Sequence, residues 1–272
     1  MTSQPSLTDS KSQKMHRSRA HEDGLFLHDL TADELQDRMS MVNREFKSIA
    51  IVSGFPTYWK NKLPNAQSIS DGDTLEFSQA SFDLTIHALS LHWANDPVGQ
   101  IIQCRRALKP DGLFLAATFG GETLHELRSC LGQAEIEITG GLSPRVAPMG
   151  QIRDMGGLLQ RAGLALPVAD AQKTNVAYRD IWHLMHDLRF MGETNALLGR
   201  LRKPTSRQIF ERANELYLKT FPSEAGGINA TFEILYLAGW MPDQNQPQPL
   251  KPGSAQSRLA DALNTKEKPL LD

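Results

Sequence analysis

Ser81-Phe-Asp-Leu-Thr-Ile-His-Ala-Leu-Ser-Leu-His-Trp-Ala-Asn-Asp96 is the stretch that indicates the class of fold. Its first half, residues 82–89, is apolar and β-branched and too short for a typical helix, so it predicts a buried strand. Asp96 and Pro97 are typical of a helix start, because Asp caps free amides and Pro needs no amide partner there. A second apolar run at residues 113–118 predicts the next strand. Strand, helix and strand in this order predict parallel strands with a right-handed crossover.

The carboxyl end of this strand carries two polar aromatic residues, His92 and Trp93. In open parallel sheets, ligands bind at the carboxyl ends of the strands. The two rings are therefore predicted to cover a ligand site. The alternative is that they only pack the junction between strand and helix.

The remaining apolar runs predict an α/β fold with a doubly wound, mainly parallel sheet and residues 82–89 at its centre. Further strands are expected at residues 48–53, 66–70, 164–176 and 231–240. Helices are expected near residues 97–108, 152–162, 181–191 and 207–220.

Composition divides the chain into three parts. Residues 1–20 contain hardly an apolar side chain, which is typical of a disordered arm. Residues 21–241 form the predicted domain, with a helical insertion at about 178–222. Residues 242–272, in which Pro and Gln repeat, are predicted to be a mostly exposed tail.

Composition also limits the class of function. The 29 basic and 31 acidic side chains leave a net charge of −2, which favours neither nucleic acid nor an anionic membrane as partner. No apolar run approaches the roughly 18 residues that cross a bilayer. The only cysteines, Cys104 and Cys130, suit a reducing compartment and are too few for a thiolate metal site. His183 and His186 are three apart, but no acid or thiol completes a ligand set, so no metal site is predicted.

The first third of the chain has room for few strands and helices. A single glycine, Gly54, follows the first predicted strand, so the glycine spacing of a dinucleotide-binding turn is absent. Only 17 positions (71 minus 54) separate Gly54 from Asp71. Each strand-helix-strand step needs about ten or more linking residues, so at most one step fits here.

Four runs carry a resemblance to a known family. They are SFDLTIHALSLHWANDPVGQIIQCRRALKPDGLFLAATFGGETLHELR, GGLSPRVAPMGQIRDMGGLLQRAG, HDLRFMGETNA and ATFEILYLAGW. The runs resemble the class I S-adenosylmethionine-dependent methyltransferase-like family, and most closely the group of the mitochondrial complex I assembly factor of the arginine-hydroxylase type and its bacterial relatives. The biotin-pathway malonyl-carrier-protein methyltransferase is a more distant relative. The similarity covers about residues 81–261 and implies a Rossmann-like sheet with residues 231–240 as an antiparallel strand near one edge.

The resemblance implies a site for S-adenosylmethionine. In the family, a glycine-rich turn follows the first strand and a second strand ends in an acid that holds the ribose, and both features are missing here. The Asp71-Gly72 pair matches the family's acid after the third strand, which contacts adenine. The implied cofactor-binding residues are Gly54, Asp71, Gly72, Leu89 and His92, and the substrate-pocket candidates are His92, Trp93, Glu122 and Arg145.

Several candidates have a structural alternative. Glu122 and His125 could bind substrate or transfer protons, but the dipole of a helix start already favours an acid at Glu122. Arg145 could clamp an anionic group or lie at the surface. Glu193 and Asn195 could close the pocket, or belong to an ordinary helix end at Gly192.

Two functions from different classes follow. The first is an S-adenosylmethionine-dependent methyltransferase-like enzyme that modifies a protein substrate of the respiratory complex I assembly pathway. The second is a non-catalytic assembly factor that keeps the fold as a binding platform. The enzyme is placed first because the rim from His92 to Arg145 matches the family in detail. A bacterial-type cytoplasmic location is expected, with the mitochondrial matrix as the alternative, and the oligomeric state stays open.

Overall fold

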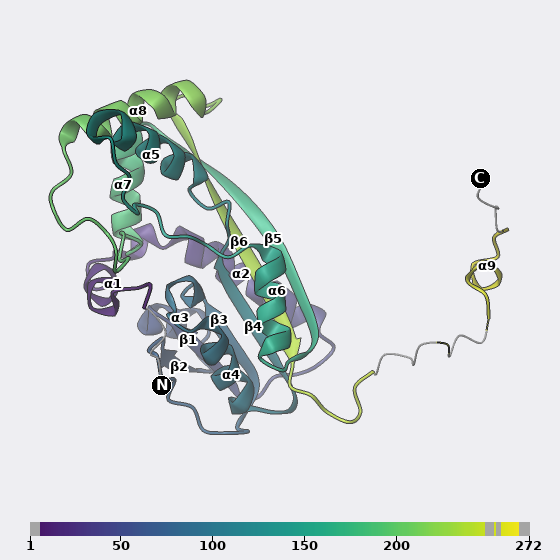
Figure 1. Ribbon diagram of the computed structural model, residues 1–272. Helices are drawn as coiled ribbons and strands as arrows, with labels where there is room; N and C mark the ends of the chain where they lie inside the picture. Colours follow the sequence, from purple (N-terminus) through teal and green to yellow (C-terminus); the bar gives the residue numbers. More distant parts are fainter. Residues whose placement is uncertain (1–5, 248–252, 254–256, 267–272) are drawn as a thin grey trace. The chain divides into compact units, whose positions relative to one another are not determined.

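The computed structural model describes residues 6–247, 253 and 257–266, and its core is a six-stranded sheet with helices on both faces (Figure 1). The strands lie in the order β2-β1-β3-β4-β6-β5. Their bounds are Ile49–Ser53 for β1, Ala66–Ser70 for β2, Phe82–Ala88 for β3, Leu108–Phe119 for β4, Ala165–Tyr178 for β5 and Ile228–Trp240 for β6.

The helices surround this sheet within one unit of the chain, Met1–Pro242, and α9 lies in a second unit, Asp243–Asp272. Their bounds are α1 Ser10–Arg17, α2 Phe26–Met41, α3 Pro56–Lys62, α4 Pro97–Ala107, α5 His125–Thr139, α6 Ile152–Arg161, α7 Ile181–Phe190, α8 Arg207–Thr220 and α9 Leu259–Ala262, with 3-10 turns η1 Glu22–Gly24 and η2 Leu91–Trp93. None of the described helices is long and apolar enough to cross a membrane.

Both faces of the sheet are buried. In β4, Leu113 and Leu115 pack in the cluster that contains residues of α2 and α3, while Phe114 and Ala116 pack in the cluster that contains residues of α4 and α6. Side chains of a strand alternate between its two faces. The run at 113–118 is therefore continuously apolar because each face is covered by helices.

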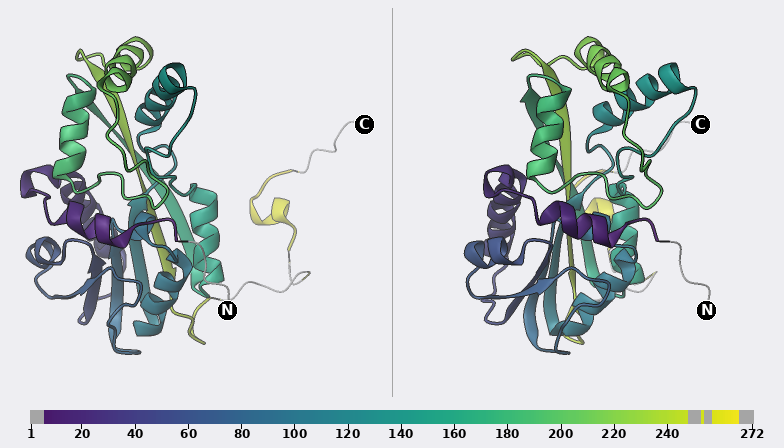
Figure 2. Two further views of the ribbon diagram at one scale, coloured as in Figure 1. Left: turned by 60° about the vertical axis from the view of Figure 1, so that its left-hand side comes forward. Right: turned by 90° about the vertical axis from the view of Figure 1, so that its left-hand side faces the viewer.

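The predicted α/β fold is confirmed. β1 pairs in parallel with β2 and with β3, and β3 pairs in parallel with β4, so β3 is an interior strand. β6 runs antiparallel to β4 and to β5, next to the edge. Helices α7 and α8 lie between β5 and β6 in the chain, and with α5 they gather at one end of the sheet (Figure 2).

The shortened first third is confirmed as well. Only α3 and β2 lie between Gly54 and Asp71, and β2 pairs directly with β1, with Ser53 opposite Ser70. Asp71 therefore follows the strand beside β1, whereas the resemblance matched Asp71 to the family's acid after the third strand. One helix-strand step is missing from this edge of the sheet.

The amino-terminal stretch differs from the prediction. Composition predicts a disordered arm over residues 1–20, of which residues 1–5 lie outside the described residues. Ser10–Arg17 instead form helix α1. Asp9 caps this helix and accepts a hydrogen bond from Arg200 at 3.0 Å, and Arg17 pairs with Asp71 at 2.6 Å. Few apolar contacts are needed because ion pairs to distant residues hold the helix, and a count of apolar residues does not detect them.

Candidate substrate and cofactor site

The carboxyl end of β3 is a sharp turn. Leu89 has a φ of +42°, a left-handed conformation that is uncommon for a residue with a side chain, and its N–H donates to the carbonyl of Ala117 at 2.9 Å. This turn leads into η2, which places His92 and Trp93 beyond the end of the strand. Strained residues of this kind concentrate at functional sites.

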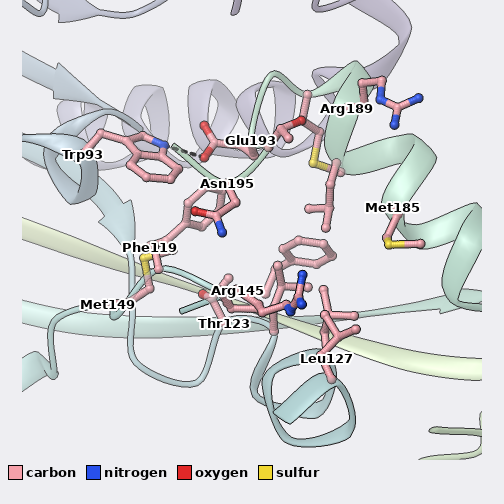
Figure 3. Close-up of a pocket in the computed structure, with 18 of the residues that line it drawn as sticks. Trp93, Phe119, Thr123, Leu127, Arg145, Met149, Met185, Arg189, Glu193 and Asn195 are labelled. Carbon is pink, nitrogen blue, oxygen red and sulfur yellow. Dashed lines mark hydrogen bonds between the residues drawn. The ribbon is translucent and has the colours of Figure 1, made fainter. Parts of the chain in front are cut away.

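A buried carboxylate lies at the centre of this rim. Glu193 follows α7 after Gly192, whose φ of +76° favours glycine. Its Oε2 accepts a hydrogen bond from Trp93 Nε1 at 2.7 Å (Figure 3). It also accepts one from His92 Nε2 at 3.1 Å. The side chain of Glu193 is 8% exposed and that of His92 is 1% exposed. The residues that the sequence placed at the rim and after α7 thus meet in one cluster.

The carboxylate of Glu193 keeps its charge despite burial. Burial raises its pKa, but the nearby His92, the positive charge of Arg17 and the hydrogen bonds from His92 and Trp93 outweigh burial, so the pKa lies below the usual value. An ionised carboxylate only accepts hydrogen bonds, so His92 donates from Nε2. Glu193 Oε1 and His92 Nδ1 have no hydrogen-bond partner within the described part of the chain. A buried polar atom without a partner costs about 1–3 kcal/mol, which favours a ligand that bonds it.

Glu193 lines a cavity of about 250 Å³ (Figure 3). The wall is mostly apolar and is built from η2, the end of β4, α5, the loop before α6, α7 and α8. An apolar pocket with a few convergent polar groups is the usual form of a small-molecule or side-chain site. The lining residues are Trp93, Phe119, Thr123, Leu124, Leu127, Leu131, Arg145, Val146, Ala147, Met149, Met185, Leu188, Arg189, Met191, Glu193, Thr194, Asn195, Phe210 and Phe232.

Arg145 lines this cavity, but its guanidinium is already engaged. Two of its nitrogens donate to the carboxylate of Glu135 at 2.6 and 3.1 Å, and a third donates to Thr205 at 2.6 Å. These bonds join the loop between α5 and α6 to the segment before α8. The structure therefore places Arg145 as a clamp within the protein itself.

The other substrate candidates lie in different places. The side chain of Glu122 is 46% exposed, lies 3.9 Å from Lys173 and is not among the residues that line the cavity. His125 begins α5, and its Nδ1 donates to the carbonyl of Glu122 at 3.0 Å. Asn195 does line the cavity and donates to the carbonyl of Pro144 at 2.9 Å.

Two of the implied cofactor residues, Gly54 and Asp71, contact the side chain of Arg17. We call the group of Gly54, Phe55 and Asp71 the cradle. The Arg17 guanidinium lies against Gly54, where an added Cβ would come within 2.2 Å of its Cζ. Arg17 Nη1 donates to Asp71 Oδ2 at 2.6 Å, and the guanidinium lies 5.8 Å from the centre of the Phe55 ring. The carbonyl of Gly72 accepts from Gln100 Nε2 at 3.0 Å.

The cradle does not fit S-adenosylmethionine. Arg17 fills the space against Gly54 and engages the acid Asp71. The N–H of Phe55 is not free either, because it donates to Ser53 Oγ at 3.1 Å, and Pro56 has no N–H. The turn that cradles a cofactor in related folds depends on such free amides.

No group of three or more potential metal-ligating side chains lies close together in the described residues. His183 and His186 are exposed on α7. Cys104 and Cys130 are buried free thiols, and burial raises the pKa of Cys130 to about 11 and that of Cys104 still further. Neither thiol is therefore a reactive thiolate at neutral pH.

Sequence reasoning missed Arg17 as a site residue. It lies in the stretch that composition assigned to a disordered arm, and its partner Asp71 is 54 positions away. The one local signal in the sequence was the absence of a glycine-rich turn after the first strand. This absence does not indicate which side chain lies there.

The chain matches a protein family and several individual proteins of known name. Residues 32–116 match the family described as a methyltransferase domain. The chain is 35% identical over 246 residues to the mitochondrial arginine-hydroxylase NDUFAF5 of Danio rerio, which covers 90% of this chain and 70% of that protein. It is 38% identical over 196 residues to NDUFAF5 of Homo sapiens, covering 72% of this chain and 56% of that protein.

More distant proteins match as well. The malonyl-[acyl-carrier protein] O-methyltransferase of Laribacter hongkongensis is 34% identical over 173 residues, which cover 64% of this chain and 56% of that protein. The YcgJ protein from Bacillus aligns with a TM-score of 0.45 and 13% identity over 82% of this chain and all of its own. The match thus spans little more than half the length of several curated relatives.

Proposed function

Because this chain belongs to the methyltransferase-like family that includes the arginine-hydroxylase NDUFAF5, we propose that it binds an arginine side chain of a protein substrate in the cavity beside Glu193. The resemblance implies a substrate in the respiratory complex I assembly pathway. We infer a role as an assembly factor that holds an arginine-bearing segment of such a subunit.

The observation that carries this proposal is the free oxygen of Glu193. Its Oε1 has no partner within the described part of the chain, although the carboxylate is buried and ionised. A guanidinium is planar and carries five N–H donors, which suits a carboxylate better than any other side chain does. Trp93, Phe119 and Phe232 supply aromatic walls on which a guanidinium can stack.

A binding role suits the cradle better than methyl transfer does. S-adenosylmethionine-dependent methyl transfer is the function that the sequence placed first, and the methyltransferase domain match over residues 32–116 favours it. Methyl transfer needs the cofactor in line with the acceptor. With Arg17 against Gly54 and paired with Asp71, the contacts that the cofactor would make at these two residues are already taken.

The resemblance and the composition also indicate where the protein acts and what kind of partner it binds. We propose a cytoplasmic location of bacterial type, with the mitochondrial matrix as the alternative. The near-neutral charge of −2 supports a protein partner and gives no electrostatic support to nucleic acid.

The test is a binding measurement with paired peptides. Peptides from complex I subunits with a central arginine are compared with the same peptides carrying citrulline, which has nearly the same shape without the charge. We expect Glu193→Gln to weaken arginine-peptide binding about ten-fold or more, because a charge-assisted bond contributes about 1.5–3 kcal/mol. Fluorescence anisotropy gives the Kd.

Glu122→Gln is the matched control, because it removes the charge of a carboxylate that does not line the cavity. It should leave the Kd within about two-fold. Equal affinity for arginine and citrulline peptides, or equal effects of the two variants, contradicts the proposal.

A further inference from the structure

We propose that helix α1 is a built-in substitute for the cofactor, with Arg17 occupying the cradle permanently and supporting the loop that carries Glu193. The inference goes beyond arginine-peptide binding, because it concerns the amino-terminal helix and the cradle. It rests on the disagreement between the family's cofactor and the residues of this chain.

Arg17 lies where the ends of β1 and β2 meet. Gly54 follows β1 and Asp71 follows β2, and these two strands are neighbours that end side by side. Arg17 reaches both residues, lying against the backbone of Gly54 and pairing with Asp71 at 2.6 Å. The side chains of Arg17 and Asp71 are only 6% and 11% exposed. A buried pair of this kind leaves an uncompensated charge if either partner is removed.

Helix α1 is attached to the rest of the domain at both of its ends. The helix crosses the carboxyl ends of the parallel strands, as both views of Figure 2 show. Before it, the N–H groups of Leu7 and Thr8 donate to Asn95 Oδ1 at 2.8 and 2.9 Å, and the N–H of Asp9 donates to the carbonyl of Ala196 at 2.8 Å. The helix is therefore attached to the rim at its start and to the cradle at its end.

Helix α1 also contacts the loop that carries Glu193. An added Cβ at Gly192 would lie 3.1 Å from Arg17 Cα, so the loop packs directly on α1. His16 Nδ1 donates to the carbonyl of Thr194 at 3.1 Å. The charge of Arg17 also helps to keep Glu193 ionised. The sulfonium of the family's cofactor is a cation too, so Arg17 supplies a positive charge in the same part of the fold.

Two further donors of Arg17 are buried without a partner. Its Nε and Nη2 have no hydrogen-bond partner within the described residues, and Arg17 lines a second cavity of about 250 Å³ together with Gly54, Phe55 and Tyr58. That volume is large enough for several waters. Arg17 therefore fills the position against Gly54 and leaves a cavity beside the cradle.

The experiment measures thermal unfolding of the full chain with and without 1 mM S-adenosylmethionine or S-adenosylhomocysteine. We expect neither compound to raise the Tm of the wild type, and calorimetric titration to give no binding heat. Arg17→Met should lower the Tm by roughly 5 °C or more, because it leaves Asp71 buried and unpaired. It should also weaken arginine-peptide binding at least three-fold through the Glu193 loop.

Arg19→Met is the matched control, since Arg19 is exposed two residues further on. It should leave Tm and peptide affinity unchanged. A Tm increase with S-adenosylmethionine in the wild type overturns the inference, because it would make α1 a displaceable plug. A gain of cofactor binding in Arg17→Met alone supports it, because only the substituted chain then has the cradle open. If Arg17→Met does not fold, the wild-type titration and Arg17→Lys, which keeps the charge and should bind no cofactor, still decide it. The cofactor readout does not depend on whether any arginine peptide binds.

Discussion

His87 and His28 are fully buried, and burial lowers the pKa of His87 from 6.5 to about 4 and that of His28 to about 3. Each ring also makes a hydrogen bond, and the one from His87 to Gln100 raises the pKa of His87 without outweighing burial. His87 Nε2 donates to Gln100 Oε1 at 2.7 Å, and His28 Nδ1 accepts from Trp59 Nε1 at 3.1 Å. In the unfolded chain both rings take up a proton near pH 6.5, while the folded chain leaves them neutral. The contribution of these two rings to stability is therefore complete above pH 6.5 and is lost as the pH falls toward 4.

The resulting prediction concerns the free energy of unfolding between pH 7 and pH 5. Each buried histidine should lower the free energy of unfolding by about 1.4 kcal/mol for every pH unit below 6.5. By pH 5 each has therefore removed about 2 kcal/mol. His87→Asn should lose about 2 kcal/mol less than the wild type over this interval, as measured by urea unfolding at the two pH values. The exposed His183→Asn should keep the wild-type slope. An unchanged slope in His87→Asn would show that His87 is protonated in the folded chain.

At the scale of elements, the loop from Gly140 to Gly150 forms one wall of the cavity and has no regular structure except an isolated bridge to Gly120. Its conformation depends on Arg145, which joins Glu135 of α5 to Thr205 before α8. Burial raises the pKa of Glu135, but the hydrogen bonds from Arg145 and Ser143 outweigh it, so the pKa is lowered and the carboxylate stays charged.

Arg145→Met should therefore act on stability first. Removing one partner of this largely buried pair is expected to cost on the order of 3 kcal/mol in urea unfolding. Arginine-peptide affinity should fall less than in Glu193→Gln, because Arg145 shapes the wall and does not bind the guanidinium. Arg153→Met, on α6 and exposed, is the control and should change neither quantity. A peptide affinity lost with no change in stability would instead assign Arg145 to the substrate.

At the scale of the whole molecule, the sheet and its covering helices belong to one unit that ends at Pro242. The site lies entirely within this unit, since both Glu193 and the cradle belong to it. The Pro- and Gln-rich composition after residue 242 predicts that the tail adds little to the stability of the fold.

A chain that ends at Pro247 should therefore keep the properties of the full chain. Its Tm is expected to stay within about 2 °C, equivalent to less than about 1 kcal/mol for a domain of this size. Arginine-peptide affinity should be unchanged. Removal of residues 1–20 is the contrasting variant, because it deletes α1 and should lower both. A carboxyl-terminal truncation that unfolds the domain would show that the tail is part of the fold.

The sequence by itself determined the parallel core of this protein. Apolar runs at strand length, an Asp-Pro helix start and short connections are local signals, and local signals fix which elements form and in what order. The interval of 17 positions between Gly54 and Asp71 likewise limited that edge to one step, because chain length sets a physical bound. His92 and Trp93 could be placed at the rim for the same reason, as the ends of parallel strands converge.

Only the tertiary structure decided where the site residues lie and what they contact. Glu193 meets Trp93 across 100 positions of chain, and Arg17 meets Asp71 across 54. Ion pairs and hydrogen bonds between residues so far apart leave no periodic or compositional trace, so a charged residue in the sequence does not reveal its partner. Arg145 has the residue type of an anion clamp but clamps Glu135 instead. The cradle was filled by Arg17 because burial of a charge requires a matched partner in three dimensions.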